Sequence, residues 1–433
     1  MKFALVNPNW TFNGSIYFGC RDPHFPLEFG YSKVLLERQG HEAMIIDGQL
    51  FDLSLDAIAR QVGELGADVA VLTTAPSYLF WRCPPPELRV PQELADALRP
   101  HVETLVAVGP HASATPRATL AKLDVDIVVM GECEEVVPRL AAAERQTIAG
   151  IAYSTNGNPT VQGDVQAADL GKLPALHWPD AWIWRHRHHH HRFDREPSGP
   201  GAEMETSRGC PYHCSFCAKI DFRDRYRRRP LDVIAEELDG FVEQGVEYVY
   251  FIDEIFLPNR ELLQLIEQRG IQFGIQTRLD LWKPQLIELL GRAGCVSIEA
   301  GVESLSAEGR AQLDKNCRME TEELTQRLLL ARQHVPFVQA NLIRMEQDDL
   351  DAVRRWRERL QSAGVWANDP VPLFPYPSSP DYRKLWGVPD DHAWERALQH
   401  YLQQFDSMSE LQEERPLPLE ALEHEWEAQW LSR

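Results

Sequence analysis

Three cysteines, Cys210, Cys214 and Cys217, lie close together near the middle of the chain, in the segment SRGCPYHCSFC (residues 207–217). Three thiolates at this spacing can hold one small iron–sulfur cluster, but a closed site needs a fourth ligand. One iron of a four-iron cluster would then stay open to an exchangeable ligand, such as a substrate or a cofactor. The alternative is a zinc knuckle, for which His213 inside the motif is available as a fourth ligand.

The remaining composition limits the class of protein. The chain has 433 residues, of which 44% are hydrophobic and 25% charged, so we expect two soluble domains with an appendage. A net charge of -21 argues against a nucleic-acid partner, because phosphate binding needs a basic surface. No apolar run approaches the roughly 20 residues of a membrane helix, and the start MKFALVNPNW reads as a core strand rather than a signal peptide. We therefore expect a cytoplasmic protein with no membrane partner.

Five further cysteines stand apart from the motif, at positions 20, 83, 133, 295 and 317. In a reducing compartment they are expected to pack as small apolar residues rather than to form disulfides. Cys20 and Cys83 fall in irregular segments, so a place near a cofactor is also open to them.

Residues 1–165 alternate between apolar strands and amphipathic helices, which predicts an α/β domain with a doubly wound, five-stranded parallel sheet. A hairpin over 147–162 is expected to close it. The predicted strands are Lys2–Asn7, His41–Asp47, Asp68–Thr73, Thr104–Val108 and Val125–Met130. The predicted helices are Tyr31–Arg38, Leu55–Leu65, Pro91–Leu98 and Pro116–Leu123.

Ligands of such sheets bind where the carboxyl ends of the strands turn into helices. Small residues at these turns would let a bulky ligand approach the backbone N–H groups. There is no GxGxxG after the first strand, so a dinucleotide is disfavoured. The candidate ligand-binding residues at these ends are Thr74, Pro76, Ser77, Gly109, Pro110, His111, Gly131 and Glu132.

Residues 203–370 repeat the unit of strand then helix six times, which predicts an incomplete (βα)6 TIM-type barrel. The predicted strands are Met204–Arg208, Glu247–Ile252, Ile271–Thr277, Cys295–Ala300, Phe337–Ile343 and Trp366–Phe374. The predicted helices are Leu231–Glu243, Arg260–Gln268, Pro284–Arg292, Glu320–Arg332 and Leu350–Ala363. Barrel chemistry belongs at the carboxyl ends of strands. The polar residues predicted there are Asp253, Glu254, Arg278, Glu303 and Ser304.

Three other segments complete the organisation. The insertion over 78–86 is aromatic and proline-rich, and would either cover a ligand or pack on the surface. The linker 166–202 contains four consecutive histidines (188–191), which either contact a substrate or metal or belong to a solvated linker. Residues 371–433 form a small C-terminal helical region with helices over Asp391–Phe405 and Leu419–Leu431, placed where it can overhang the barrel.

The motif CxxxCxxC, with the aromatic Phe216 just before its third cysteine, resembles the signature of the radical S-adenosylmethionine (radical SAM) superfamily. The resemblance implies that the open iron of a 4Fe-4S cluster chelates S-adenosyl-L-methionine (SAM), which an electron cleaves to methionine and a 5'-deoxyadenosyl radical. It implies that Asp253 and Glu254 hold the SAM amine, that Glu303 meets the ribose, and that Arg278 meets the carboxylate or a ribose oxygen. An external electron donor, such as flavodoxin or ferredoxin, is implied as well. Around the fifth barrel strand the family's GlPgE-like turn is absent, so no residue is assigned to adenine.

The domain before the motif resembles the cobalamin-binding domain of cobalamin-dependent radical SAM enzymes. The resemblance rests on Gly109-Pro110-His111 and Gly131-Glu132, which match loops of that class. The DxHxxG motif of other cobalamin domains is missing, which fits a cofactor with its dimethylbenzimidazole tail off and no histidine on cobalt.

The resemblance implies a C-methyltransferase, in which a deoxyadenosyl radical takes hydrogen from an unactivated carbon of a small molecule and methylcobalamin supplies the methyl group. Cyclisation, oxidation or rearrangement without methyl transfer is open in the same architecture. A non-catalytic iron–sulfur or metal-binding protein is the alternative from another class.

Overall fold

The computed structural model describes residues 1–10, 23–77, 84, 86, 88–155, 157–186, 199–345, 347–404, 407–408 and 417–418. Several predicted features lie outside the described residues, namely Cys20, Cys83, most of the insertion 78–86, the histidines 188–191 and the helix Leu419–Leu431. No helix in the described parts of the chain is long and apolar enough to cross a membrane.

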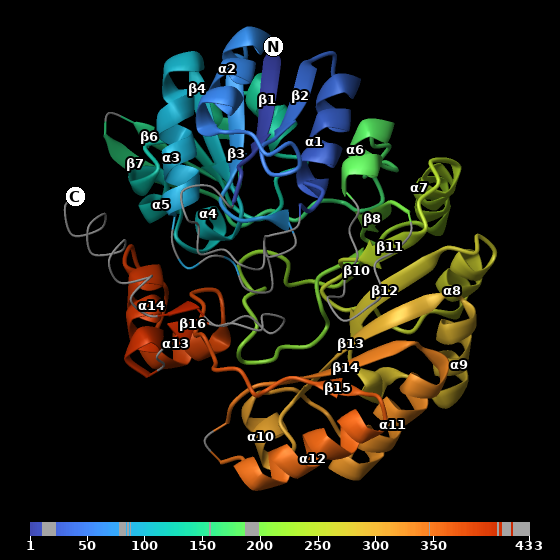
Figure 1. The fold of residues 1–433 in the computed structure, drawn as a ribbon. Coiled ribbons are helices and arrows are strands. Elements are labelled where there is room, and N and C mark those ends of the chain that lie inside the picture. Colours follow the sequence, from blue (N-terminus) through green and yellow to red (C-terminus); the bar gives the residue numbers. More distant parts are fainter. Residues whose placement is uncertain are drawn as a thin grey trace.

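Seven strands form the first sheet, in the order β2-β1-β3-β4-β5-β6-β7 (Figure 1). Its strands are β1 (Lys2–Asn7), β2 (Glu42–Asp47), β3 (Val69–Thr73), β4 (Thr104–Val108), β5 (Ile127–Val129), β6 (Ile151–Thr155) and β7 (Asn158–Gln162). The first five pair in parallel, whereas β6 and β7 form the predicted hairpin and extend the sheet as antiparallel strands. The predicted doubly wound α/β sheet is therefore confirmed.

Helices cover both faces of the first sheet because its strands are apolar on both sides. Along β1, Ala4 and Val6 belong to one apolar core, and Phe3 and Leu5 belong to another on the opposite face. The helices and 3-10 helices of this half are α1 (Leu27–Arg38), α2 (Leu55–Leu65), α3 (Arg89–Leu98), η4 (Arg99–His101), α4 (Pro110–Ala114), α5 (Pro116–Lys122), η5 (Val137–Ala141), η6 (Arg145–Thr147) and, in the linker, α6 (Asp180–His186).

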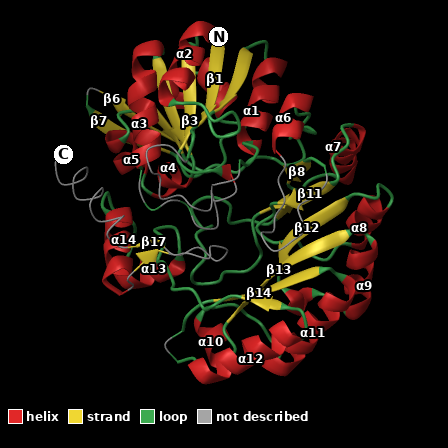
Figure 2. Ribbon diagram, viewed as in Figure 1, coloured by secondary structure: helices red, strands yellow, loops and turns green. Residues whose placement is uncertain are grey.

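Six parallel strands form the second sheet, in the order β8-β11-β12-β13-β14-β15. Its strands are β8 (Gly201–Met204), β11 (Tyr248–Phe251), β12 (Gln272–Thr277), β13 (Cys295–Glu303), β14 (Phe337–Leu342) and β15 (Trp366–Ala367). Helices line its outer side, as expected for an incomplete TIM-type barrel (Figure 2). These are α7 (Leu231–Glu243), α8 (Arg260–Glu267), η7 (Leu279–Leu281), α9 (Pro284–Arg292), α10 (Ala307–Gln312), α11 (Thr321–His334) and α12 (Leu350–Ser362).

The two halves share an apolar core. Tyr31 of α1 and Leu176 and Trp178 of the linker are buried together with Leu238 and Phe241 of α7. Each half covers apolar surface of the other, so the two halves hold one relative position. The cysteine motif lies between them. In Figure 1 this segment is the green loop between the two sheets.

The C-terminal region contains α13 (Pro380–Trp386), α14 (Ala393–Gln404) and the short antiparallel pair β16 (Ser407–Met408) and β17 (Leu417–Pro418). Helix α14 confirms the prediction over Asp391–Phe405. Its Trp394, together with Phe374, Tyr376 and Tyr401, forms a separate apolar cluster that includes Ala218 just after the cysteine motif.

Three predicted strands were too long by three residues or more. The strand expected over Val125–Met130 covers only Ile127–Val129. The strand expected over Trp366–Phe374 ends at Ala367, because the side chain of Asn368 bonds to the N–H and the carbonyl of Leu342 in place of a continued ladder. The strand expected over Met204–Arg208 ends at Met204, and Ser207–Arg208 form a separate strand, β9, which pairs with β10 (Arg227–Arg228). The helices α4, α6, α10 and α13 (Pro380–Trp386) were not predicted.

Candidate active site

The cysteine motif is a loop between two short antiparallel strands. Arg208 on β9 lies opposite Arg227 on β10, so the chain enters and leaves the loop at the same place. Gly209 has a φ of +77°, and a Cβ there would lie 2.2 Å from the carbonyl oxygen of Arg225. Only glycine fits this turn. We call residues 209–226 the cysteine loop.

The three cysteines are half-buried in this loop, and the N–H of Cys217 donates to the carbonyl of Cys214 over 3.1 Å. Burial raises the pKa of the Cys210 thiol to about 11. Burial, and then the charges of Cys210 and Cys214, raise the pKa of Cys217. The three sulfur groups thus act on one another, as ligands of one cluster must.

The donor set fits a 4Fe-4S cluster better than a single ion. Among the described residues, no three His, Cys, Asp or Glu side chains surround one metal position. Cluster ligands need not do so, since each thiolate binds a different iron. His213 is 69% exposed in its side chain and lies 3.8 Å from Asp224, so it does not complete a closed zinc site.

Asp253 and Glu254 follow β11, as predicted. Both accept hydrogen bonds from residues that lead into the cysteine loop or begin it. Asp253 accepts from the N–H of Thr206 over 2.7 Å, from its hydroxyl over 2.5 Å and from the Ser207 hydroxyl over 2.7 Å. Glu254 accepts from the N–H of Gly209 over 2.8 Å. Burial raises the pKa of Asp253 to about 7. These carboxylates therefore hold the start of the cysteine loop in place. Their contact with the SAM amine stays a prediction.

Arg278 follows β12 and stacks on the cysteine loop. Its guanidinium carbon lies 4.1 Å from the ring centroid of Tyr212, between the first two cysteines. Asp280 binds its Nε over 3.1 Å and its Nη2 over 2.8 Å. Nη1 is buried without a partner among the described residues. A buried donor of this kind suits a carboxylate or ribose oxygen of a ligand.

Glu303 ends β13 and Ser304 follows it, and the charge of Glu303 acts on the Cys214 thiol. Glu303 adopts a left-handed φ of +66°, and its Oε1 accepts from Lys315 Nζ over 2.8 Å. Burial raises the pKa of Cys214, and the charges of Lys315, Glu303 and Arg278 also act on that thiol. Ser304 instead donates to Asp348 over 2.8 Å, so its predicted ligand contact has a competing protein partner.

Phe216, the aromatic residue of the cysteine motif, is half-buried.

The sequence alone did not point to Lys315. Lys315 lies outside any barrel strand, after the short helix α10, and its partner Glu303 is twelve residues earlier, at the end of β13. The signal available was a lysine shortly downstream of Gly301-Val302-Glu303-Ser304, and such a lysine is usually solvated.

Gly109, Pro110 and His111 lie at the end of β4, where Gly109 adopts a φ of 122° and α4 begins. His111 is completely buried, and its ring centroid lies 4.1 Å from that of Trp394 on α14. Trp394 also donates from Nε1 to the Thr115 hydroxyl over 3.2 Å. The C-terminal region therefore covers this predicted ligand loop, which the sequence could not indicate.

The C-terminal region also contacts the cysteine loop. The Ser215 hydroxyl donates to Asp381 over 3.1 Å, and the N–H of Asp381 donates to the carbonyl of Ser215 over 2.9 Å. Arg383 pairs with Asp221 over 2.6 Å. Helices α13 and α14 thus bind both the loop and the edge of the first sheet.

Gly131 and Glu132 follow β5. Gly131 has a φ of +84°, and a Cβ there would lie 2.2 Å from the carbonyl oxygen of Gln166 in the linker. Glu132 is buried and accepts from Arg208 over 3.0 Å, from Arg227 over 3.1 Å and from the N–H of Ala168 over 3.0 Å. We predicted Glu132 as a cofactor contact, but the structure gives its carboxylate three protein donors, two of them from β9 and β10.

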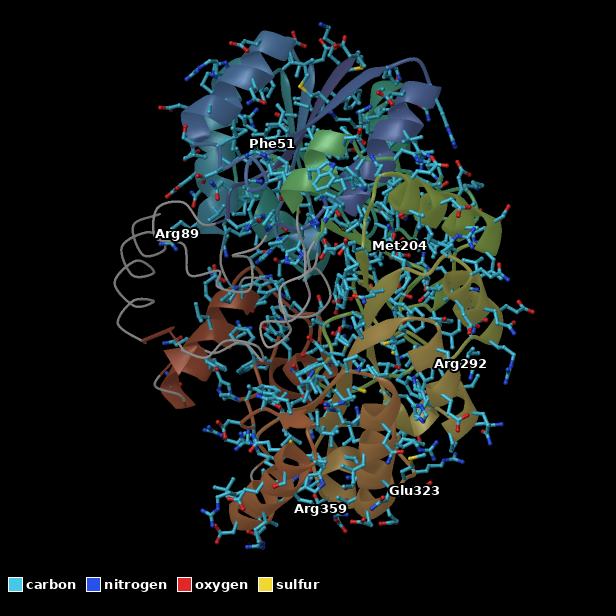
Figure 3. The ribbon with its side chains drawn as sticks, turned by 45° about the vertical axis from the view of Figure 1, so that its right-hand side comes forward. Phe51, Arg89, Met204, Arg292, Glu323 and Arg359 are labelled. Atoms are coloured by element: carbon cyan, nitrogen blue, oxygen red, sulfur yellow. The ribbon has the colours of Figure 1, made fainter. Side chains whose placement is uncertain are left out.

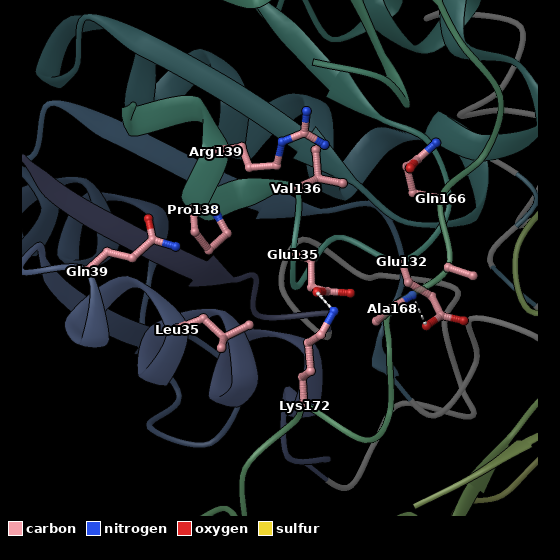
Figure 4. A pocket seen from close by; sticks show the side chains of 11 residues that line it. Leu35, Gln39, Glu132, Glu135, Val136, Pro138, Arg139, Gln166, Ala168 and Lys172 are labelled. Carbon is pink, nitrogen blue, oxygen red and sulfur yellow. Dashed lines mark hydrogen bonds and ion pairs between the residues drawn. The ribbon is translucent and has the colours of Figure 1, made fainter. Parts of the chain in front are cut away.

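Glu132 also forms part of the wall of a surface pocket of about 390 Å³ (Figure 4). The pocket opens between α1, η5 and the linker, and none of the three motif cysteines lines it. Its charged lining residues are Glu132, Glu135, Arg139 and Lys172.

At the end of β3, the hydroxyl of Thr74 is buried without a partner among the described residues. Nearby, Ser77 donates to Glu28 of α1, whose other carboxylate oxygen is also unpartnered within the described chain. Pro76 lies buried between Thr74 and Ser77. Buried hydroxyl and carboxyl groups of this kind suit a ligand that carries amides, because an amide both donates and accepts. The edge thus fits the amide side chains of a corrin.

The pKa of the buried Glu28 carboxyl can be tested through the free energy of unfolding. Burial raises its pKa from 4.5 to about 7, so the folded protein holds a proton that the unfolded chain releases. The resulting cost grows as the pH rises from 4.5 to about 7 and stays constant above it, at roughly 3 kcal/mol. Glu28→Gln is therefore expected to stabilise the protein by up to roughly 3 kcal/mol at pH 8 and to have little effect near pH 4.5. Denaturant unfolding at both pH values measures this.

The matched control is Glu37→Gln, on an exposed part of α1. It should change the free energy of unfolding at pH 8 by much less than Glu28→Gln does, because an exposed ion pair such as the one between Glu37 and Lys33 contributes little. An equal effect of Glu28→Gln at both pH values would show that folding does not raise the pKa of Glu28.

Comparisons with known proteins agree with this geometry. Residues 204–356 match the model of the Radical SAM superfamily. The chain is 26% identical over 323 residues to an uncharacterized methyltransferase of Pyrococcus horikoshii, which covers 71% of this chain and 66% of that protein. It is 27% identical over 376 residues to an anaerobic magnesium-protoporphyrin IX monomethyl ester cyclase of Cereibacter sphaeroides, covering 79% of this chain and 56% of that protein. The chain thus spans less than two thirds of either relative.

Among solved structures, the radical S-adenosylmethionine methyltransferase TsrM from Kitasatospora setae, solved with cobalamin and a [4Fe-4S] cluster bound, matches with a TM-score of 0.67. The match covers 88% of this chain and 73% of that one at 20% identity, so it shows a shared fold. The chain contains a radical SAM domain. The predicted resemblance to cobalamin-dependent radical SAM enzymes is confirmed in the fold.

Proposed function

We propose that this chain is a cobalamin-dependent radical SAM enzyme that transfers a methyl group to an unactivated carbon atom of a small molecule. The observation that carries the proposal is the position of the cysteine loop. Arg208 and Arg227, at the two ends of the loop, bind Glu132 at the carboxyl edge of the first sheet. At the edge of the second sheet, the charges of Arg278 and of Glu303, which Lys315 binds, act on the Cys214 thiol. One loop thus joins the two edges at which parallel sheets bind ligands.

Residues 203–370 would form the unit that holds the cluster and SAM. Cys210, Cys214 and Cys217 would each bind one iron. Nη1 of Arg278, which has no partner among the described residues, would bind a SAM carboxylate or ribose oxygen. Glu303, held by Lys315, would accept from the ribose diol. When bound, the cluster and SAM supply an electron and a 5'-deoxyadenosyl radical that abstracts hydrogen. The chain's own part is to orient SAM and keep water away.

Residues 1–165 would form the unit that holds cobalamin, with Thr74, Ser77 and the backbone around Gly109 at its edge. When bound, cobalamin supplies a weak cobalt–carbon bond from which a methyl group can pass to a carbon radical. Residues 166–202 would link the two units, and residues 371–433 would shape access to the site. An external electron donor and a cytoplasmic location belong to the same proposal.

Cyclisation without methyl transfer is the second candidate, since one relative bears the name of a cyclase. Methyl-labelled SAM separates the two, because only a methyltransferase moves the label into its product. Candidate small molecules can be screened in this way with the full chain.

The first test is anaerobic reconstitution with iron and sulfide, followed by addition of SAM and a reductant. The proposal expects a 4Fe-4S absorption band and 5'-deoxyadenosine. The absence of both would favour a non-catalytic metal-binding protein. Equilibrium binding of cobalamin to the full chain tests the second cofactor, and no retention would leave a radical SAM enzyme without cobalamin.

Arg278→Gln is expected to weaken SAM binding by about 10- to 100-fold, because a charged donor to a buried ligand oxygen is lost. The cluster should form normally, since Arg278 stacks on the ring of Tyr212 and donates to Asp280, and neither residue is a cluster ligand. SAM titration of the reconstituted protein measures the affinity. Arg292→Gln, at an exposed arginine of α9 (Figure 3), is the control. Unchanged affinity in Arg278→Gln would remove Arg278 from the SAM site.

A further inference from the structure

Arg208 is a completely buried arginine two residues before Cys210. Its Nε donates to both carboxylate oxygens of Glu205, over 2.9 and 3.0 Å. Its Nη1 reaches the other half of the molecule, where it lies 3.0 Å from Glu132 and 2.6 Å from Glu134. A single guanidinium therefore joins the strand that begins the cysteine loop to the end of β5.

Arg227, which follows the cysteine loop, also binds the carboxylate of Glu132. Its Nη2 pairs with Glu132 Oε1, while its Nη1 donates to Glu132 Oε2 over 3.1 Å and to the carbonyl of Ala168 over 2.7 Å. Since Arg208 and Arg227 lie opposite each other in the β9–β10 pair, both ends of the loop are fixed to one residue of the first sheet. Planar guanidinium groups fix orientation as well as distance.

The charges in this cluster depend on each other. Burial alone would raise the pKa of Glu132, but Arg208 and Arg227 lower it. Arg208 and Arg223 likewise hold the pKa of Glu205 at about 2 against the effect of burial. Glu132 and Glu205 are therefore ionised, and loss of one arginine would leave the buried charge of Glu132 with only one of these two partners. The loop would then be expected to shift or loosen.

We propose that Arg208 and Arg227 are positioning residues that set the cysteine loop against the carboxyl edge of the first sheet through Glu132. This inference rests on the proposed function for its consequence: a cluster bound by the loop and a cobalamin bound at that edge would keep one relative placement. Without the arginines, both cofactors would bind but their separation would become heterogeneous.

The first test is hydrogen exchange of the full chain without cofactors, so it stands even if the proposed function fails. In Arg227→Gln, amides of residues 209–226 should exchange at least tenfold faster than in the wild type, while β13 stays within twofold. Arg227 is the better position for the substitution, since its side chain is 18% exposed and that of Arg208 is not exposed. Arg227→Lys keeps the positive charge but loses the planar guanidinium that binds both carboxylate oxygens of Glu132. Amide exchange in the cysteine loop should then have an intermediate rate.

The second test is pulsed electron paramagnetic resonance of the protein loaded with reduced cluster and cob(II)alamin. We expect one narrow cobalt–cluster distance in the wild type and a distribution at least twice as wide in Arg227→Gln. Arg359→Gln is the control, because Arg359 pairs bidentately with Glu322 at the end of the molecule away from the first sheet (Figure 3). Loop exchange at the wild-type rate in Arg227→Gln, or an unchanged distance distribution, would overturn the inference. A wild type that binds no cobalamin contradicts the proposed function instead, and the exchange result still decides this inference.

Discussion

Cys214→Ala is expected to abolish the formation of 5'-deoxyadenosine, with a loss of about a thousandfold or more. Two thiolates cannot hold the cluster with one open iron, so the electron that cleaves SAM has no carrier. The measurement is the iron and sulfide content of the reconstituted protein, together with deoxyadenosine formed from SAM and a reductant. Loss of both together is the expected result.

Cys295→Ala is the matched control. Cys295 is a buried cysteine of β13, and its thiol donates to the carbonyl of Ser297 rather than facing the loop. This variant should keep the cluster. If Cys214→Ala retained a full cluster and cleaved SAM, the cysteine loop would not be the site of the chemistry.

Asp253→Ala is expected to lower the free energy of unfolding by about 3 kcal/mol, because three buried donors of Thr206 and Ser207 lose their acceptor. The same change should prevent cluster assembly, since those residues lead into the cysteine loop. Denaturant unfolding and iron content measure the two effects.

Asp253→Asn separates anchoring from ligand binding. Its amide oxygen can still accept the Thr206 N–H, and the two hydroxyls can turn to accept from its NH2 group. Stability and cluster content should therefore stay near the wild type. If Asp253 also holds the SAM amine, as the family resemblance implies, the SAM affinity of Asp253→Asn should fall while its cluster content and stability do not. Normal cluster content in Asp253→Ala would contradict the anchoring role.

Most strands and helices of both sheets were predictable, because local patterns specify them. Lys2–Asn7, Thr104–Val108 and Leu231–Glu243 have the predicted bounds. One of the errors lies where a side chain replaces a backbone bond. Asn368 ends β15 by binding Leu342, and no local pattern indicates such a long-range bond.

The site was predictable only in part. The cysteines and the residues at the strand ends follow from spacing and topology, and the structure brings Arg278 and Glu303 to Cys214 as expected. The bond between Glu132 and Arg208 joins residues 76 apart. Since a turn residue after a strand is equally consistent with ligand contact, the sequence could not show that Glu132 holds the loop.

The stacking of Trp394 on His111 has a consequence for the order of events during synthesis. Thr115, which binds the same tryptophan, is 279 residues earlier in the chain. Domains generally fold as units as they emerge, N-terminal first. The first sheet is then complete while the ribosome has still to make α14, and the edge around His111 is uncovered throughout that interval. A bulky cofactor has its least obstructed approach to this edge in the nascent protein.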